Sequence, residues 1–150
     1  MPFELVYTSI AKPENIAETE LQRILASSRR HNVAHGITGV LLFDRGGFVQ
    51  LLEGSRAAVQ SVYYDRILKD TRHGGVYLSW EADVAARSFG DWSMGFALHS
   101  DLPQAPSAEW DGFLRDGIKS LDLSGPASSG RRLLLAIYGA IRSAPEQKRV

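Results

Sequence analysis

Two predicted strands and two predicted helices each place a polar side chain on an otherwise apolar face. In "GGFVQLLEG" (46–54) the side chains alternate between the two faces of a strand, so Gln50 shares its face with Phe48 and Leu52. Tyr7 interrupts an apolar strand face in the same way. A buried amide without a partner costs about 1–3 kcal/mol. Gln50 therefore needs a hydrogen-bonding neighbour in the core, or a ligand that enters the core.

The helices contribute polar groups to the same layer. The apolar stripe of the first predicted helix ends in Ser28 and Asn32, and that of the second ends in Arg66 and Asp70, which have the i, i+4 spacing of an ion pair. The four elements thus outline a slot lined by Leu and Ile with amide, phenol and guanidinium groups, which is typical of a site for a flat heteroaromatic ligand. Asn32 can match a ring carbonyl beside an N–H, and Arg66 can donate to a carbonyl oxygen or a phosphate.

Each of these residues also has a purely structural interpretation. Asn32 can simply end its helix. Arg66 and Asp70 can form a solvated pair worth a few tenths of a kcal/mol. Tyr7 can be a core tyrosine whose hydroxyl bonds Gln50. Composition and periodicity therefore predict a pocket and leave its ligand open.

The periodicity gives the element order β-α-β-β-α-β-β. We expect strands and helices over these residues: strands 3–10, 36–44, 48–54, 75–84 and 92–100, helices 19–32 and 55–70. Thr19 and Gln22 fit a capping box, Gly36 is a stop signal, and Ser55 is the expected cap of the second helix. The segment "RGG" is the expected turn between the second and third strands. A repeated βαβ unit with both helices on one face of an antiparallel sheet is the ferredoxin-like α+β fold.

The C-terminal third follows a different pattern. Apolar residues are spaced helically over 107–121, and "RRLLLAIYGAIRS" (131–143) predicts a helix that is apolar around much of its circumference. Such helices need cover, so we expect the two of them on the second face of the sheet. Any remaining apolar surface would suit a dimer or a partner.

The composition excludes several kinds of site. The chain has 150 residues, 44% hydrophobic and 23% charged, with 17 basic and 17 acidic residues and no cysteine. This excludes thiol chemistry and disulfides, and nothing in it favours nucleic acid or a membrane as a partner. His31 and His35 have helical spacing but no acidic third ligand nearby, so no metal site is expected. We expect a soluble cytoplasmic protein of one domain.

From residue 3 to about residue 98 the chain resembles the BLUF family, blue-light sensors that use FAD. The resemblance rests on six segments in order: "LVYTS" (5–9), "SSRRHN" (27–32), "GITGVLLF" (36–43), "FVQLLEG" (48–54), "RILKDTRH" (66–73) and "RSFGDWSMGF" (87–96). It implies a ferredoxin-like fold with the flavin ring between the two helices. The family's photoactive tyrosine falls on Tyr7, its switching glutamine on Gln50 and its ring-binding asparagine on Asn32.

The resemblance assigns further positions. Arg66 and Asp70 match positions against the flavin, and His31, Arg72 and His73 match contacts around the ring edge and the ribityl-phosphate side. Ser28 shares the stripe of Asn32, so we expect it to bind the cofactor too. Trp92 and Met94 match strand positions that rearrange on signalling, and they share a strand face. We expect this last strand to relay the change to the C-terminal helices, although ordinary core packing also accounts for both residues.

The expected organisation is a photosensor core over 1–100, a helical extension over 101–143 and a flexible tail over 144–150. This is like the short class of the family, a sensor that acts through another protein. A homodimer or higher oligomer is expected, with an unidentified downstream protein as partner.

The expected activity is photochemical and does not involve enzymatic turnover. Excited flavin is a strong oxidant, Tyr7 can supply an electron and a proton, and Gln50 lies between them. Reversing the orientation or tautomer of the Gln50 amide exchanges its donor and acceptor. The new hydrogen bond to a flavin carbonyl would give a small red shift. The alternatives are a flavin-dependent oxidoreductase, against which no general acid or base is positioned, a dimerising module that has lost its flavin, and the input domain of a longer light-regulated enzyme.

Overall fold

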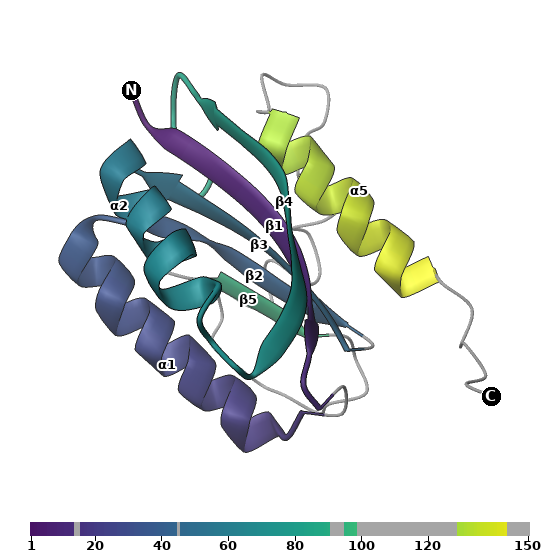
Figure 1. The fold of residues 1–150 in the computed structure, drawn as a ribbon. Helices are drawn as coiled ribbons and strands as arrows, with labels where there is room; N and C mark the ends of the chain where they lie inside the picture. Colours follow the sequence, from purple (N-terminus) through teal and green to yellow (C-terminus); the bar gives the residue numbers. More distant parts are fainter. Residues whose placement is uncertain (14–15, 45, 91–94, 99–128, 144–150) are drawn as a thin grey trace.

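A five-stranded sheet with helices on both faces forms the fold (Figure 1). The computed structural model describes residues 1–13, 16–44, 46–90, 95–98 and 129–143. The elements follow in the order β1 (Phe3–Ala11), α1 (Glu18–His35), β2 (Thr38–Asp44), β3 (Gly47–Gly54), α2 (Arg56–Ser61), η1 (Val62–Ile67), β4 (His73–Asp83), β5 (Gly95–Leu98) and α5 (Ser129–Ser143). The predicted order β-α-β-β-α-β-β and the ferredoxin-like α+β fold are confirmed.

The strands lie in the order β4-β1-β3-β2-β5. β1 pairs antiparallel with β3 and β4, and β3 pairs antiparallel with β2. The fifth strand departs from the antiparallel expectation, because β5 pairs parallel with β2 at the far edge of the sheet. β4 and β5 therefore lie at opposite edges of the sheet.

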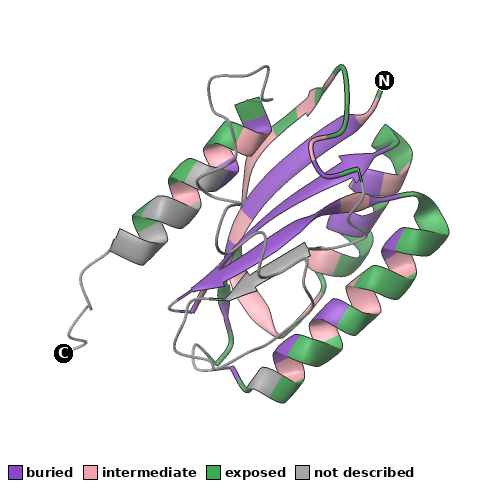
Figure 2. Cartoon of the chain, turned by 180° about the vertical axis from the view of Figure 1, so that it is seen from behind, coloured by how far each residue is buried: buried purple, intermediate pink, exposed green. Residues whose placement is uncertain are grey.

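The central strands form the core. The residues of β1, β2 and β3 are almost all buried, whereas those of β4 are mostly intermediate or exposed (Figure 2). The register pairs Tyr7 directly with Gln50, and Leu5 with Leu52. Because directly opposed residues share a face, the predicted alternation of β1 and β3 places Tyr7 and Gln50 side by side under the helices.

The ends of α1 confirm one predicted signal and contradict another. Gly36 ends the helix with φ 66°, and its N–H donates to the carbonyl of Asn32, as the stop signal predicts. The capping box is wrong, because α1 begins at Glu18 with Ala17 as its cap and no side-chain cap bond. Thr19 thus lies inside the first turn, where its hydroxyl cannot cap the helix.

The second predicted helix is two elements. Ser55 caps α2 as predicted, and its Oγ accepts from the N–H of Ala58 at 3.2 Å. From Val62 the chain widens into the π-helix η1, in which the N–H of Leu68 donates to the carbonyl of Tyr63, five residues back, at 3.0 Å. The expected continuous helix over 55–70 is therefore wrong beyond Ile67, where a turn begins.

Helix α5 packs on the face of the sheet opposite α1 and α2 (Figure 1). Its Leu134 is fully buried, and Leu133 and Ile137 pack against the core. This confirms the predicted cover for the helix at 131–143, while the helix expected over 107–121 lies outside the described residues. Within the described part of the chain, no helix is long and apolar enough to cross a membrane.

Gly39 provides a test of how tightly the central strands approach. A Cβ added there would lie 2.0 Å from the backbone oxygen of Leu51. We expect Gly39→Ala to lower the free energy of unfolding by more than about 2 kcal/mol, because the clash is with backbone that cannot turn aside. Gly90→Ala is the matched control, since its Cβ would meet Arg87 at an ordinary 3.8 Å. Urea unfolding of both variants checks this, and equal midpoints would contradict it.

Candidate functional site

A cavity of about 270 Å³ opens between α1 and η1 against the sheet. It is near the lower end of the range for small-molecule sites. Aliphatic side chains from α1, the sheet and η1 form its walls. The lining residues are Tyr7, Ile24, Ser27, Ser28, His31, Asn32, Leu41, Phe48, Gln50, Leu52, Val62, Arg66, Ile67, Lys69, Asp70, Arg72 and His73. The structure thus brings all nine residues expected to bind a cofactor to one cavity.

Tyr7 and Gln50 form the floor of the cavity. The Tyr7 hydroxyl donates to Oε1 of Gln50, and each residue is only 4% exposed. The amide oxygen accepts this bond, which makes the NH₂ the donor side of Gln50. The orientation of an amide is assigned from its hydrogen bonds, and here the phenol sets it. The neighbour that Gln50 needs in the core is therefore Tyr7.

The environment of Tyr7 keeps its phenol protonated. Burial raises the pKa of Tyr7 far above its ordinary value, and the nearby charges of Asp70 and Tyr63 raise it further. The Tyr63 ring lies 5.7 Å from the Tyr7 ring, and the His73 ring meets it edge-on at 6.2 Å. Tyr7 is thus a neutral phenol held by aromatic packing and by one hydrogen bond.

Helix α1 aims an amide into the slot. Asn32 is 2% exposed and lies in the last turn of the helix. Its backbone carbonyl accepts a hydrogen bond from the N–H of Gly36. Ser28 lies one turn earlier on the same stripe and also lines the cavity. The backbone of Asn32 ends the helix while its side chain faces the cavity, so the structural and functional interpretations of this residue are compatible.

The expected ion pair between Arg66 and Asp70 is wrong. Asp70 lies beyond the end of η1, so the two residues are not one helical turn apart. Asp70 instead pairs with Arg72, whose Nη2 lies 2.7 Å from Oδ2, and Arg72 also donates to Glu20 of α1 at 3.1 Å. This chain of ion pairs ties the turn after η1 to the start of α1 across one end of the slot.

The pKa values follow these contacts. Burial disfavours the charged form of Asp70, but hydrogen bonds from Arg72 and the charges of Arg72 and His73 outweigh it and lower the pKa of Asp70. The hydrogen bond to Asp70 raises the pKa of Arg72, against the effect of burial. The cavity therefore keeps a carboxylate and a guanidinium charged at its edge.

Basic side chains gather at the mouth of the cavity. Arg66 donates to Oγ of Ser27 at 3.1 Å, which bridges η1 and α1, and Lys69 and His31 also line the cavity. Burial lowers the pKa of His31, and the charges of Arg66 and His35 lower it further. His31 stacks on His35 with 4.0 Å between ring centroids. Within the described residues, no group of three potential metal ligands is assembled.

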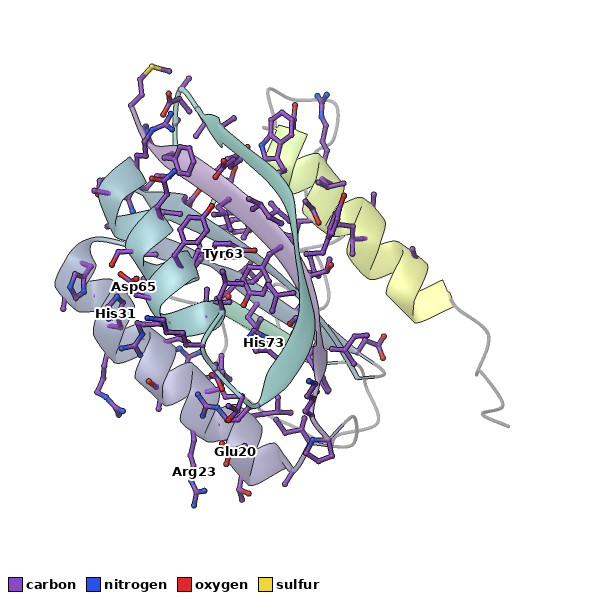
Figure 3. The ribbon with its side chains drawn as sticks, in the orientation of Figure 1. Glu20, Arg23, His31, Tyr63, Asp65 and His73 are labelled. Carbon is purple, nitrogen blue, oxygen red and sulfur yellow. The ribbon has the colours of Figure 1, made fainter. Side chains whose placement is uncertain are left out.

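His73 uses both ring nitrogens on the protein. Its Nε2 lies 2.7 Å from the carbonyl oxygen of Ile67, which can only accept, so Nε2 carries a proton. Its Nδ1 lies 2.7 Å from the hydroxyl of Ser9, which donates to it in the neutral ring. Figure 3 shows His73, at the start of β4, and Tyr63, in η1, on the side of the sheet that α1 and α2 cover. His73 thus joins the end of η1 to β1 beside Tyr7.

Sequence reasoning missed several lining residues. Ile67 lines the cavity and was not assigned to it, although it follows Tyr63 by four residues, the spacing of a helical stripe that could have found it. Ser27 and Glu20 contact the site through the long side chains of Arg66 and Arg72. No periodicity marks such partners. Trp92 and Met94 lie outside the described residues.

The donor set fits a flat ring that carries carbonyl and N–H groups. A neutral phenol and two amides face a cavity with aliphatic walls, and basic side chains at its mouth suit a phosphate. These groups suit a flavin.

Part of this chain is similar in sequence to known proteins. Photoactivated adenylate cyclase subunit beta of Euglena gracilis is 34% identical over 92 residues, which is 61% of this chain and 11% of that protein. The blue light- and temperature-regulated antirepressor BluF of Escherichia coli (strain K12) is 30% identical over 90 residues, 60% of this chain and 22% of BluF. The chain thus spans about a tenth of the length of the curated relatives that match it first.

Solved structures share its fold. The dark state structure of BlrB, a BLUF protein, superposes with a TM-score of 0.64 and 29% identity, over 93% of this chain and 96% of BlrB. BlrP1 of Klebsiella pneumoniae superposes with a TM-score of 0.72 and 28% identity, over 93% of this chain and 33% of BlrP1. The family described as "BLUF: Sensors of blue-light using FAD" matches residues 3–95, more than half of the sequence. This chain belongs to the BLUF family of flavin-binding blue-light sensors.

Proposed function

We propose that this chain senses blue light with FAD bound between α1 and η1, and that Tyr7 and Gln50 convert absorption into a change of hydrogen bonding. The observation that carries the proposal is the buried phenol of Tyr7 donating to Gln50 at the floor of a cavity with flavin-compatible donors. Membership of the BLUF family supports the same function.

The roles of the two floor residues follow from their chemistry. Bound FAD supplies the light absorption and a strong one-electron oxidant. Tyr7 can give up an electron together with its hydroxyl proton, and Gln50 Oε1 is the acceptor placed to take that proton. When the electron and the proton return to Tyr7, the amide can be left reversed or as the other tautomer, with no net oxidation of the protein. Gln50 then presents a donor where it presented an acceptor, and the environment of the ring changes.

The remaining lining residues bind and orient the cofactor. Asn32 offers a donor and an acceptor from α1, with Ser28 one turn away on the same wall. His31 and Arg66 line the same cavity and would hold the phosphate-bearing chain of the cofactor. The pair of Asp70 and Arg72 closes one end. His73 contributes through its ring edge, since both of its nitrogens bond protein groups.

We propose FAD rather than FMN as the bound flavin. The family's description names FAD, whereas one structure of BlrP1 is titled as a complex with FMN and cyclic diGMP. Heat release of the cofactor from the purified protein, followed by chromatography against both standards, separates the two. A colourless protein would indicate a module that has lost its flavin.

We also propose that the protein acts without turnover of its own and passes its state to another protein, as a homodimer or higher oligomer. BluF is an antirepressor, and a bacterial light-regulated adenylyl cyclase covers 94% of this chain with 39% of its own length. Those names support either a separate partner or a fused one. Trp92 and Met94 remain proposed relay residues toward the C-terminal helices, and neither nucleic acid nor a membrane is proposed as partner.

Substitution of the floor residues tests the photochemistry. We expect the purified protein to be yellow and to shift reversibly to the red under blue light. Gln50→Leu and Tyr7→Phe should each keep the flavin and lose the shift, because one removes the switching amide and the other the donor phenol. Absorption spectra before and after illumination measure this.

An unchanged light response in Gln50→Leu would overturn the mechanism. A wild-type protein that is reduced by an electron donor in the dark but shows no light shift would instead support the flavin-dependent oxidoreductase. Leu42→Val is a suitable control, since Leu42 is buried but does not line the cavity.

Removal of the Asn32 side chain tests cofactor binding. We expect Asn32→Ala to weaken flavin binding by roughly 10- to 100-fold, the factor for leaving ring groups unpaired in a buried site. Fluorescence titration of the cofactor-free protein measures the Kd. Val33→Ala is the matched control, because the adjacent side chain is largely exposed. An equal loss in both variants would assign the effect to the helix and remove the binding role of Asn32.

The raised pKa of Tyr7 predicts the pH dependence. A phenol with a folded pKa above its unfolded value, 10.0, stays neutral in the native protein as the pH rises through that value. Stability is therefore lost above about pH 10, where only the unfolded chain ionises Tyr7. We expect the light response to persist up to that pH and to end with unfolding. The prediction is contradicted if the folded wild-type protein loses its light response well below pH 10. Tyrosinate absorption that appears at the same pH in the wild type and not in Tyr7→Phe would assign that loss to ionisation of Tyr7.

A further inference from the structure

A carboxyl group lies fully buried on the other face of the sheet. Glu4 is 0% exposed in β1, three residues before Tyr7, and its side chain faces α5. Its Oε1 accepts two hydrogen bonds, from the backbone N–H of Gly130 and from Nε1 of Trp80, both at 3.0 Å. A strand of the photochemical site is thereby joined to the first turn of α5 and to β4.

The first turn of α5 lies close against this carboxyl, at a glycine. A Cβ at Gly130 would lie 2.6 Å from Oε1 of Glu4 and 3.0 Å from Cδ1 of Trp80. A side chain at this position would displace the Glu4 carboxyl and the Trp80 ring, so glycine favours the close approach of α5 to the sheet. Glu4, Trp80 and Gly130 form a three-residue contact, called here the α5 latch.

One of the two carboxyl oxygens in the α5 latch lacks a hydrogen bond in the described part of the chain. The second oxygen of Glu4, Oε2, is buried and has no hydrogen-bond partner among the described residues. Glu53 lies directly opposite Glu4 in the register and is equally buried, so two carboxyl groups share one face of the sheet. Opposed acidic side chains destabilise a sheet. Within the residues that the structure describes, Glu4 therefore holds α5 through only one of its two carboxyl oxygens.

In contrast to Glu4, Glu53 accepts hydrogen bonds with both of its carboxyl oxygens. Its Oε1 accepts from the hydroxyl of Thr38 at 3.0 Å and from the N–H of Phe89 at 2.6 Å, and its Oε2 accepts from the N–H of Ser88 at 2.8 Å. Both oxygens therefore fix the segment after β4. The contrast marks Glu4 as the weaker of two otherwise similar anchors.

The strand between Tyr7 and Glu4 is able to transmit a shift. The pairing of β1 with β4 changes register between Val6 and Tyr7, so the ladder is irregular between the photochemical residue and the latch. Such irregularities interrupt the ladder and are common beside functional sites. A change at Tyr7 can therefore move β1 relative to β4, and Trp80 of β4 is one of the two donors to Glu4.

We propose that Glu4 couples β1 to α5, and that the α5 latch opens in the signalling state. This rests on the proposed light sensing and deepens it by naming an output contact among the described residues. Opening frees the first turn of α5 and uncovers the buried carboxyl on the back of the sheet.

Hydrogen exchange of the flavin-loaded full chain in the dark tests the latch itself. Gly130→Ala adds one methyl group against the Glu4 carboxyl and the Trp80 ring, and alanine also favours helix, so lost protection reports lost docking rather than lost helicity. We expect amides 130–134 to exchange about tenfold faster or more, the factor for losing a hydrogen bond to a charged group. Ser129→Ala, at the exposed neighbour, should match the wild type.

A second pair of variants keeps the test decisive if Gly130→Ala does not fold. Glu4→Gln retains the size of the side chain and weakens both bonds to Oε1, so α5 should again lose protection. Glu53→Gln should release the amides of Ser88 and Phe89 and leave α5 unchanged. Wild-type protection of α5 in Glu4→Gln would overturn the latch.

Illumination tests the coupling separately. In the wild type we expect α5 amides to exchange faster in blue light, and in Glu4→Gln to be fast in both conditions, while the flavin spectrum still shifts in both proteins. A wild type without a spectral shift would refute the light sensing alone. A normal spectral shift with equal α5 exchange in dark and light would refute the coupling alone.

Discussion

The hydrogen bond between Tyr7 and Gln50 depends on the strict alternation of faces in two paired strands. Because β1 and β3 are directly in register at these residues, a phenol and an amide meet under the helices, with the apolar walls of the slot around them. A shift of either strand by one residue would turn one of the two toward α5 and leave the other without this partner. The close approach of Gly39 to the Leu51 backbone helps to fix that register from the neighbouring strand.

Strand alternation and helix stripes in the sequence were sufficient to predict which residues meet. Tyr7, Gln50, Ser28 and Asn32 were each assigned to an apolar face, and each lines the cavity. These predictions succeeded because a strand face or a regular helical stripe is set by local spacing. The order of the elements followed from the same periodicity, with Gly36 and Ser55 marking helix ends as expected.

The predictions failed where residue spacing along the chain does not determine which side chains meet. A π-turn cannot be told from an α-turn by apolar spacing in a short segment, so the helix was expected to continue beyond Ile67. Asp70 found Arg72 because a turn brings residues two apart together, while the expected helical partner bridges to Ser27 instead. The buried Glu4 bonds the N–H of Gly130, which is 126 residues away in the sequence. Such a contact exists only after the sheet is covered.

The wide turn of η1 constrains how genes for such proteins can change. A π-turn corresponds to one residue inserted into an α-helix. Deleting a single codon within Val62–Ile67 would therefore restore the narrower helix and leave the chain after it in nearly the same register. The side chains of the wide turn itself, Arg66 among them, would lose their present positions in the cavity wall. Point substitutions can be absorbed in this segment far more readily than changes of length, so descendants of this chain should preserve its residue count between Ser55 and His73.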